Sequence, residues 1–102
     1  MGGVKIEAVF SKAGDMRFIS HLDLMRLFQR ALRRANLPVA ISQGFSPHLK
    51  ISIKKALKLG VESMDETLTV QTSISIDEAL FRKKLNGNLP EGVRIINAKR
   101  IG

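Results

Sequence analysis

Cysteine, which forms disulfides and binds metals, is missing from this sequence, and so are two of the aromatic residue types. It contains no cysteine, no tryptophan and no tyrosine among 102 residues. The lack of cysteine excludes disulfides, iron–sulfur clusters and cysteine-ligated zinc sites. No apolar run is long enough for a transmembrane helix, and the first residues do not form a secretory signal. We therefore expect a cytoplasmic protein that needs no membrane.

Acidic residues are scarce in the first part of the chain. Lysine and arginine total 17, aspartate and glutamate total 9, and the formal net charge is +8. Residues 1–58 hold 11 basic and 3 acidic side chains, whereas residues 59–102 hold six of each. The whole surplus is therefore localised, which indicates an anionic partner such as nucleic acid. The simpler alternative is a basic domain that has no such partner.

Apolar periodicity predicts six elements in a single domain spanning residues 1–102. Strands are expected from Val4 to Ser11, from Leu49 toward Leu57, around residues 67–71, and from Val93 to Ala98; helices are expected from Ser20 to about Ala35 and from about Ser75 to Leu85. Ser20 with Asp23 and Ser75 with Glu78 have the spacing of helix-capping pairs. The order βαββαβ predicts an α+β, ferredoxin-like sandwich with a four-stranded antiparallel sheet and two helices on one face.

The first expected helix has an apolar face and an arginine face. Leu24, Phe28, Ala31, Leu32 and Ala35 recur at helical spacing and predict the core side. The opposite side carries Arg26, Arg30, Arg33 and Arg34, and Arg17 comes just before the helix. Arginine can contact two phosphate oxygens at once, so this face predicts an RNA-binding surface, assisted by Lys50 and Lys54. A solvated helix face is the alternative interpretation.

Two histidines and one loop are further candidates. His21 and His48 could form an acid–base pair that cleaves RNA, although nothing in the sequence brings them together. They do not have the spacing of a metal site, and we expect neither a metal nor a cofactor. The loop containing Gly44, Phe45 and His48 has an aromatic residue beside a permissive glycine. The simpler expectation is a structural turn in which Phe45 folds back into the core.

The expected open face of the sheet is polar. It carries Lys5, Lys50, Ser52, Lys54, Thr67, Thr69 and Gln71. RNA-recognition motifs share the same order of elements but stack bases on aromatic residues of the sheet. This sequence therefore departs from that motif.

Several segments together resemble one family. They are Phe10-Ser11-Lys12, residues 17–26 (RFISHLDLMR), residues 30–35 (RALRRA), Leu37-Pro38, residues 42–48 (SQGFSPH) and Leu59-Gly60. Across about residues 4–70 they resemble the DUF2344 family, a domain that accompanies radical SAM proteins. The tyrosine usual after Glu62-Ser63 is missing, and family members usually extend beyond the equivalent of Gly102. The chain is then either a short member or the N-terminal part of a longer domain.

The resemblance implies a bacterial cytoplasmic domain with a radical SAM partner and no catalytic role that can be carried over. Radical SAM chemistry needs a cysteine-bound cluster, which this chain cannot supply. The first hypothesis is a non-catalytic module that binds or positions RNA. The alternatives are an accessory domain that docks on a radical SAM enzyme and a small histidine-dependent endoribonuclease. The sequence leaves the oligomeric state open.

Overall fold

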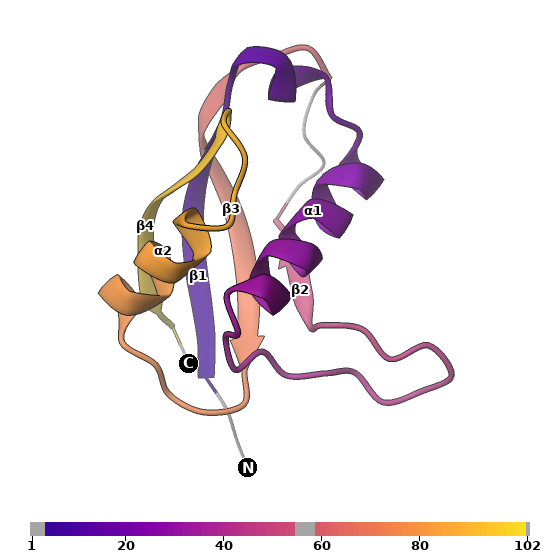
Figure 1. Cartoon of the computed structure of the whole chain (residues 1–102), viewed down its shortest axis with the longest axis vertical. Coiled ribbons are helices and arrows are strands. Elements are labelled where there is room, and N and C mark those ends of the chain that lie inside the picture. The colour runs from indigo at the N-terminus through magenta and orange to yellow at the C-terminus, as the bar shows by residue number, and fades with distance from the viewer. Residues whose placement is uncertain (1–3, 55–58, 102) are drawn as a thin grey trace.

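The computed structural model describes residues 4–54 and 59–101. One antiparallel sheet is covered on one face by two α helices, as Figure 1 shows. The elements are β1 (Val4–Lys12), a short 3-10 helix η1 (Gly14–Phe18), α1 (His21–Arg34), β2 (Ile51–Ile53), β3 (Ser63–Thr72), α2 (Glu78–Asn86) and β4 (Val93–Arg100). The strand order β2-β3-β1-β4 places β1 and β3 in the centre. The fold is α+β and matches the expected ferredoxin-like arrangement.

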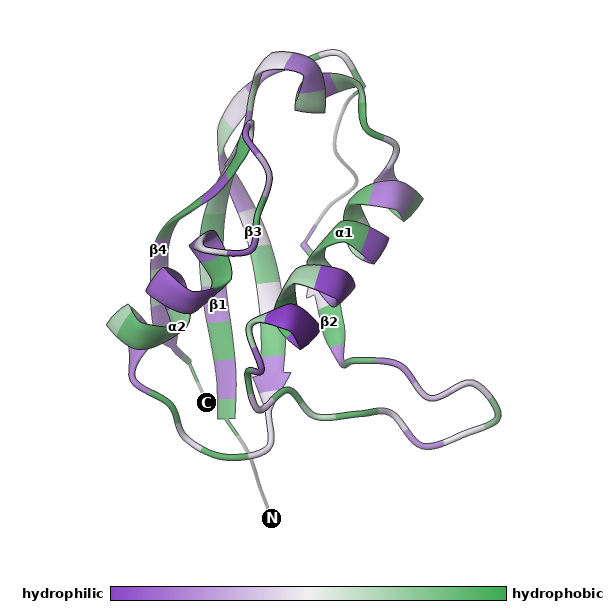
Figure 2. Cartoon of the chain, in the orientation of Figure 1, coloured by the Kyte–Doolittle hydropathy of each residue, from purple (hydrophilic) through white to green (hydrophobic). Residues whose placement is uncertain are grey.

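The core lies between the sheet and the two helices. The inward side chains Ile6, Ala8 and Phe10 of β1 are completely buried, because every second residue of a strand faces the same side. The ring of Phe10 meets the ring of Phe28 edge to face, with 4.9 Å between the centroids. All five residues expected on the inner face of α1 are buried. Figure 2 shows the resulting division of α1 into an apolar and a polar side.

The strands differ in length from those expected. β3 begins at Ser63, earlier than expected, and β2 has only three residues. Leu49 lies before β2 and forms an isolated antiparallel bridge with Ile41. The expected continuation of this strand over residues 55–57 lies outside the described residues. The connection after β1 contains the 3-10 helix η1.

The capping residues confirm one expectation and correct another. The hydroxyl of Ser20 accepts a hydrogen bond from the Asp23 backbone N–H, so Ser20 is the N-cap of α1 as expected. Ser75 is not the cap of α2; the Asp77 carboxylate accepts from the Leu80 N–H instead. Arg100 explains the difference, because its guanidinium binds Ser75 and its backbone N–H donates to Glu78. Ser75 and Glu78, the expected capping pair, therefore both accept hydrogen bonds from Arg100 of β4.

Gly92 fixes the turn between α2 and β4. Its φ of +98° lies in a region that side chains disfavour, and a Cβ at this position would stand 2.7 Å from the Ala13 carbonyl oxygen. In addition, the Ala13 N–H donates a hydrogen bond of 2.8 Å to the Gly92 carbonyl. The turn is thus joined to the end of β1.

Candidate nucleic-acid interface

The outer face of α1 presents the four predicted arginines to solvent. Arg26, Arg30, Arg33 and Arg34 are all exposed. Arg26 lies 3.7 Å from the Asp23 carboxylate, and this ion pair is itself exposed to water. Within the described residues, the other three arginines have no ion pair and no side-chain hydrogen bond. Three of the four guanidinium groups therefore keep all their donors for a ligand.

Residues 40–50 form an extended arm that leaves the body of the fold between α1 and β2, at the lower right of Figure 1. The arm is closed by hydrogen bonds between Ser42 and His48. The Ser42 N–H donates to the His48 carbonyl, and the His48 N–H donates to the Ser42 hydroxyl. At its base the Ala40 N–H donates to the Gln71 carbonyl of β3. The arm is therefore an ordered hairpin-like structure attached to the sheet.

The arm and α1 together enclose an open groove of about 850 Å³. We call it the arginine groove. It is lined by Leu22, Met25, Arg26, Gln29, Arg30, Arg33 and Arg34 of α1 and by Ser46, Pro47 and His48 of the arm. Two features that the sequence predicts separately, the arginine face and the loop, therefore meet in one place. No acidic side chain is among the lining residues.

Phe45 occupies the tip of the arm, immediately before the groove wall. The expectation that it folds into the core is wrong, because its exposed fraction is 108%. Gly44 has φ of +147°, a value that favours glycine. The arm extends away from the core, and its two sides are joined to each other at Ser42 and His48. The aromatic ring is thus held in solvent beside the groove.

One ring nitrogen of His48 is hydrogen-bonded within the arm. Its Nδ1 lies 3.1 Å from the Ser46 carbonyl oxygen and 3.2 Å from the Ser42 hydroxyl. A carbonyl oxygen can only accept, so Nδ1 carries the proton and Nε2 is the acceptor of the neutral ring. His21 is the first residue of α1 and is not among the residues that line the groove. The arginine groove therefore contains one of the two histidines.

The remaining basic candidates lie apart from the groove. Arg17 donates to the Gly14 carbonyl, and its guanidinium lies 4.4 Å from the Phe18 ring centroid. Both contacts are within η1, so Arg17 stabilises that helix. Lys54 forms an ion pair of 3.9 Å with Glu7 on the open face of the sheet. Lys50 lines a shallow depression on that face with Lys5 and Gln71. The arginines and these two lysines are thus on opposite layers of the molecule.

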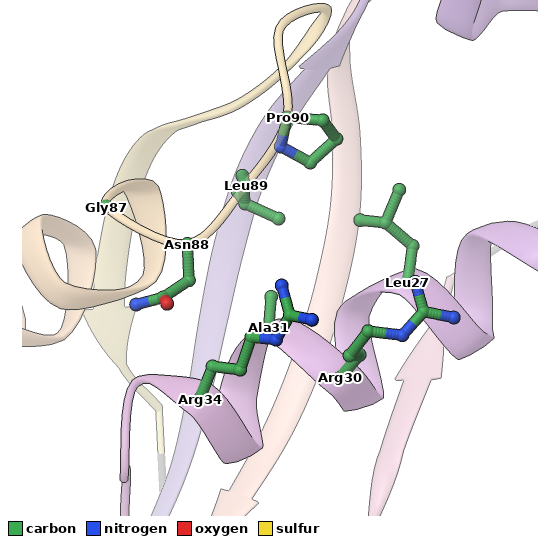
Figure 3. A pocket seen from close by; sticks show the side chains of 8 residues that line it. All are labelled: Leu27, Arg30, Ala31, Arg34, Gly87, Asn88, Leu89 and Pro90. Carbon is green, nitrogen blue, oxygen red and sulfur yellow. The ribbon is translucent and has the colours of Figure 1, made fainter.

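A second hollow, of about 370 Å³, lies on the other side of Arg30 and Arg34. Its lining residues are Leu27, Arg30, Ala31 and Arg34 of α1 and Gly87, Asn88, Leu89 and Pro90 after α2 (Figure 3). We call it the interhelix hollow. In Figure 3 the Arg34 side chain runs back over Ala31 and places its guanidinium between the two segments. Arg30 and Arg34 line both the groove and the hollow.

Sequence reasoning missed the residues after α2 that complete this hollow. Asn88, Leu89 and Pro90 look like ordinary turn residues, and no local pattern links them to α1. Only the packing of α1 and α2 on the same face of the sheet brings them beside Arg34. Correlated substitutions at these positions and on α1, in an alignment of related sequences, would have indicated this contact.

Exposed apolar side chains gather near η1. Phe18 packs against Gly60, and its exposed fraction is 56%. Leu59 and Val61 on either side of Gly60 are also exposed. We call Phe18, Leu59 and Val61 the η1 patch. Exposed apolar residues that lie close together can form a contact surface.

Within residues 4–54 and 59–101, no three metal-binding side chains lie close enough to share an ion. No helix in the same ranges is both long and apolar enough to cross a membrane.

The chain matches a bacterial protein family over nearly its whole length. The model of a family described as "Uncharacterized protein conserved in bacteria (DUF2344)" matches residues 5–102. A comparison with curated proteins found no match.

Proposed function

We propose that this chain, which belongs to the DUF2344 family, is a non-catalytic RNA-binding module. The arginine groove holds the phosphates of the RNA. The observation that carries this proposal is the gathering of four arginines in one groove that has no acidic lining residue. A structural role would pair these guanidinium groups with carboxylates or carbonyls, and only Arg26 has such a partner among the described residues.

Shape and chemistry both support a phosphate chain as the ligand. Arg26, Arg30 and Arg33 follow one another along the helix at steps of four and three residues, so their guanidinium groups form a row. A row of separate cations fits successive phosphates better than one small anion. The ring of His48 on the opposite wall adds a polar group that can contact the RNA.

Phe45 supports an RNA that has unpaired bases. An exposed phenylalanine beside a basic groove offers a flat surface on which a base can stack. Replacing Phe45 by alanine should weaken binding of single-stranded RNA by about 5- to 150-fold, the range typical of one lost stacking contact. Binding of fully paired RNA of the same length is the control and should change little. Equal losses for both RNAs would show that the ring does not stack on an unpaired base.

The direct test compares two triple variants with equal loss of charge. Arg30→Gln/Arg33→Gln/Arg34→Gln removes three groove cations, and Lys5→Gln/Lys50→Gln/Lys54→Gln removes three from the open face of the sheet. Affinity for single-stranded RNA is measured by fluorescence anisotropy over a series of salt concentrations. The arginine variant should flatten the log–log salt dependence by about two units, at roughly 0.7 per lost phosphate contact.

The lysine variant should keep most of the slope of the unchanged protein. If the lysine variant loses as much as the arginine variant, or more, the RNA lies on the sheet and the groove is not its site. If neither variant nor the unchanged protein binds RNA at low salt, the proposal is wrong.

The absence of catalysis is tested separately. Purified protein should leave RNA intact, because only one histidine lines the groove and a proton-transfer pair needs a second group beside it. Reproducible cleavage that disappears in His21→Ala/His48→Ala would instead favour the endoribonuclease alternative.

A second candidate function is favoured by the η1 patch, which suits a protein partner better than RNA. The family resemblance suggests a radical SAM enzyme as that partner. Phe18→Ser/Leu59→Ser should abolish such a complex and leave RNA binding unchanged, as measured by co-purification and anisotropy. A complex that survives this double change but is lost in the arginine variant would place the partner on α1.

A further inference from the structure

We propose that the interhelix hollow is a pocket for one unpaired nucleobase that carries an exocyclic amino group. This inference rests on the proposed function, because the base would belong to the RNA whose phosphates lie in the arginine groove. The two cavities are neighbours, because Arg30 and Arg34 line both. A strand in the groove would thus have its next base within reach of the hollow.

The walls of the hollow suit a flat ring. Leu27 of α1 stands on one side, and Leu89 and Pro90 stand on the other, with Ala31 as the floor (Figure 3). Its volume of about 370 Å³ is at the lower end of the range for small-ligand sites. Apolar walls around a few fixed polar groups are the usual composition of such sites.

Asn88 gives the hollow a hydrogen-bond acceptor of fixed orientation. Its Nδ2 donates to the Lys84 carbonyl at 3.0 Å. Because a carbonyl oxygen cannot donate, the amide cannot be flipped, and Oδ1 must lie on the other side. Figure 3 shows Nδ2 turned toward α2, away from the arginines. Oδ1 makes no hydrogen bond among the described residues. It can therefore accept an N–H from a ligand.

The electrostatics of the hollow distinguish the two ends of a nucleotide. Gly87 and Asn88 follow the C-terminus of α2, where the helix dipole is negative and disfavours a phosphate. Arg30 and Arg34 stand on the opposite side and favour one. A nucleotide therefore enters with its amino group toward Asn88 and its phosphate toward α1. Adenine, cytosine and guanine each carry such an amino group, whereas uracil carries none.

The experiment compares two single-stranded RNA oligomers of about eight nucleotides, a length within the usual site size. One is oligoadenylate, and the other replaces every adenine by purine, which lacks only the amino group. The unchanged protein should bind oligoadenylate about fivefold more tightly, the effect of one hydrogen bond. Fluorescence anisotropy at one fixed salt concentration measures the ratio of the two affinities.

Two variants separate recognition from structure. Asn88→Ala should bring the affinity ratio close to one. Asn88→Asp also loses the bond to Lys84 but keeps an acceptor, so the ratio should persist. The added negative charge repels both oligomers equally and cancels in the ratio. A ratio that falls equally in both variants would mean that Asn88 acts only by holding α2.

Failure of this inference differs from failure of the proposed function. If the unchanged protein binds both oligomers equally, and the arginine variant still loses affinity, RNA binds the groove but the hollow does not read the base. If no oligomer binds at all, both proposals are wrong.

Discussion

The two helices of this fold are both basic, but they use their polar side chains differently. On α2 and the strand beside it, Arg82 donates to the Ile96 carbonyl and Arg94 donates to the Asn86 carbonyl. Asn86 also holds β4 through both of its amide atoms. On α1, by contrast, Arg30, Arg33 and Arg34 bind nothing within the described residues.

This difference shows which charges the fold needs. A polar side chain that satisfies backbone groups contributes to stability, whereas an exposed arginine with no partner contributes little. The charge surplus of the first 58 residues is therefore explained better by a ligand than by the fold. The comparison predicts that changes on α2 affect stability and that changes on the outer face of α1 affect binding.

The largest effect on stability should come from the buried face of α1, which belongs to the core in the same way as the buried face of α2. Phe28→Ala should lower the free energy of unfolding by about 3–5 kcal/mol, because it leaves a cavity against Phe10. Urea denaturation followed by circular dichroism measures the loss. Phe81→Ala on α2, which is equally buried, is the matched control. A loss below about 1 kcal/mol for Phe28 alone would show that α1 is not anchored like α2.

The next effect concerns the polar side of α2. Asn86→Ala should cost about 1–3 kcal/mol, because it leaves the Ile95 N–H and carbonyl without partners. The thermal midpoint should fall by about 4–8 °C for each kcal/mol lost. RNA affinity at a temperature where the variant is folded should stay the same. Loss of binding without loss of stability would contradict the assignment of roles to the two helices.

The N-caps should make a smaller and equal contribution in the two helices. Ser20→Ala and Asp77→Ala each remove the side chain that accepts from the first turn. Each should cost about 1 kcal/mol. Differential scanning calorimetry would detect both changes. Ser75→Ala tests the corrected assignment of the α2 cap, and a cost to α2 larger than that of Asp77→Ala would contradict it.

The smallest effect on stability should come from the outer face of α1. Arg30→Gln/Arg33→Gln/Arg34→Gln should change the free energy of unfolding by no more than about 0.5 kcal/mol for each position. Calorimetry on the same protein samples used for RNA binding makes the two measurements comparable. A large loss of stability would mean that these arginines have structural partners and would weaken the argument for a ligand.

Local patterns were sufficient to predict the order of strands and helices, the inner face of α1 and the Ser20 cap. Each of these depends on residues close together in the chain. The α2 cap was mispredicted because Ser75 and Asp77 are both good caps, and Arg100, far along the chain, occupies the first. Phe45 was mispredicted because apolar character alone favours burial, whereas the arm that carries it extends away from the core. The groove and the hollow depend on contacts between distant segments, which a single sequence does not encode visibly.

The turn after α2 has a consequence for how a ligand would bind. A hydrogen bond holds each end of the turn. At one end the Asn88 side-chain amide donates to the Lys84 carbonyl, and at the other the Ala13 N–H donates to the Gly92 carbonyl. Leu89 and Pro90 lie between these two attachments and are already ordered before any ligand arrives. Ordering a loop residue on binding costs about 1–2 kcal/mol of backbone entropy. A wall that is preorganised avoids that cost, so even one base contact there can contribute to affinity almost in full.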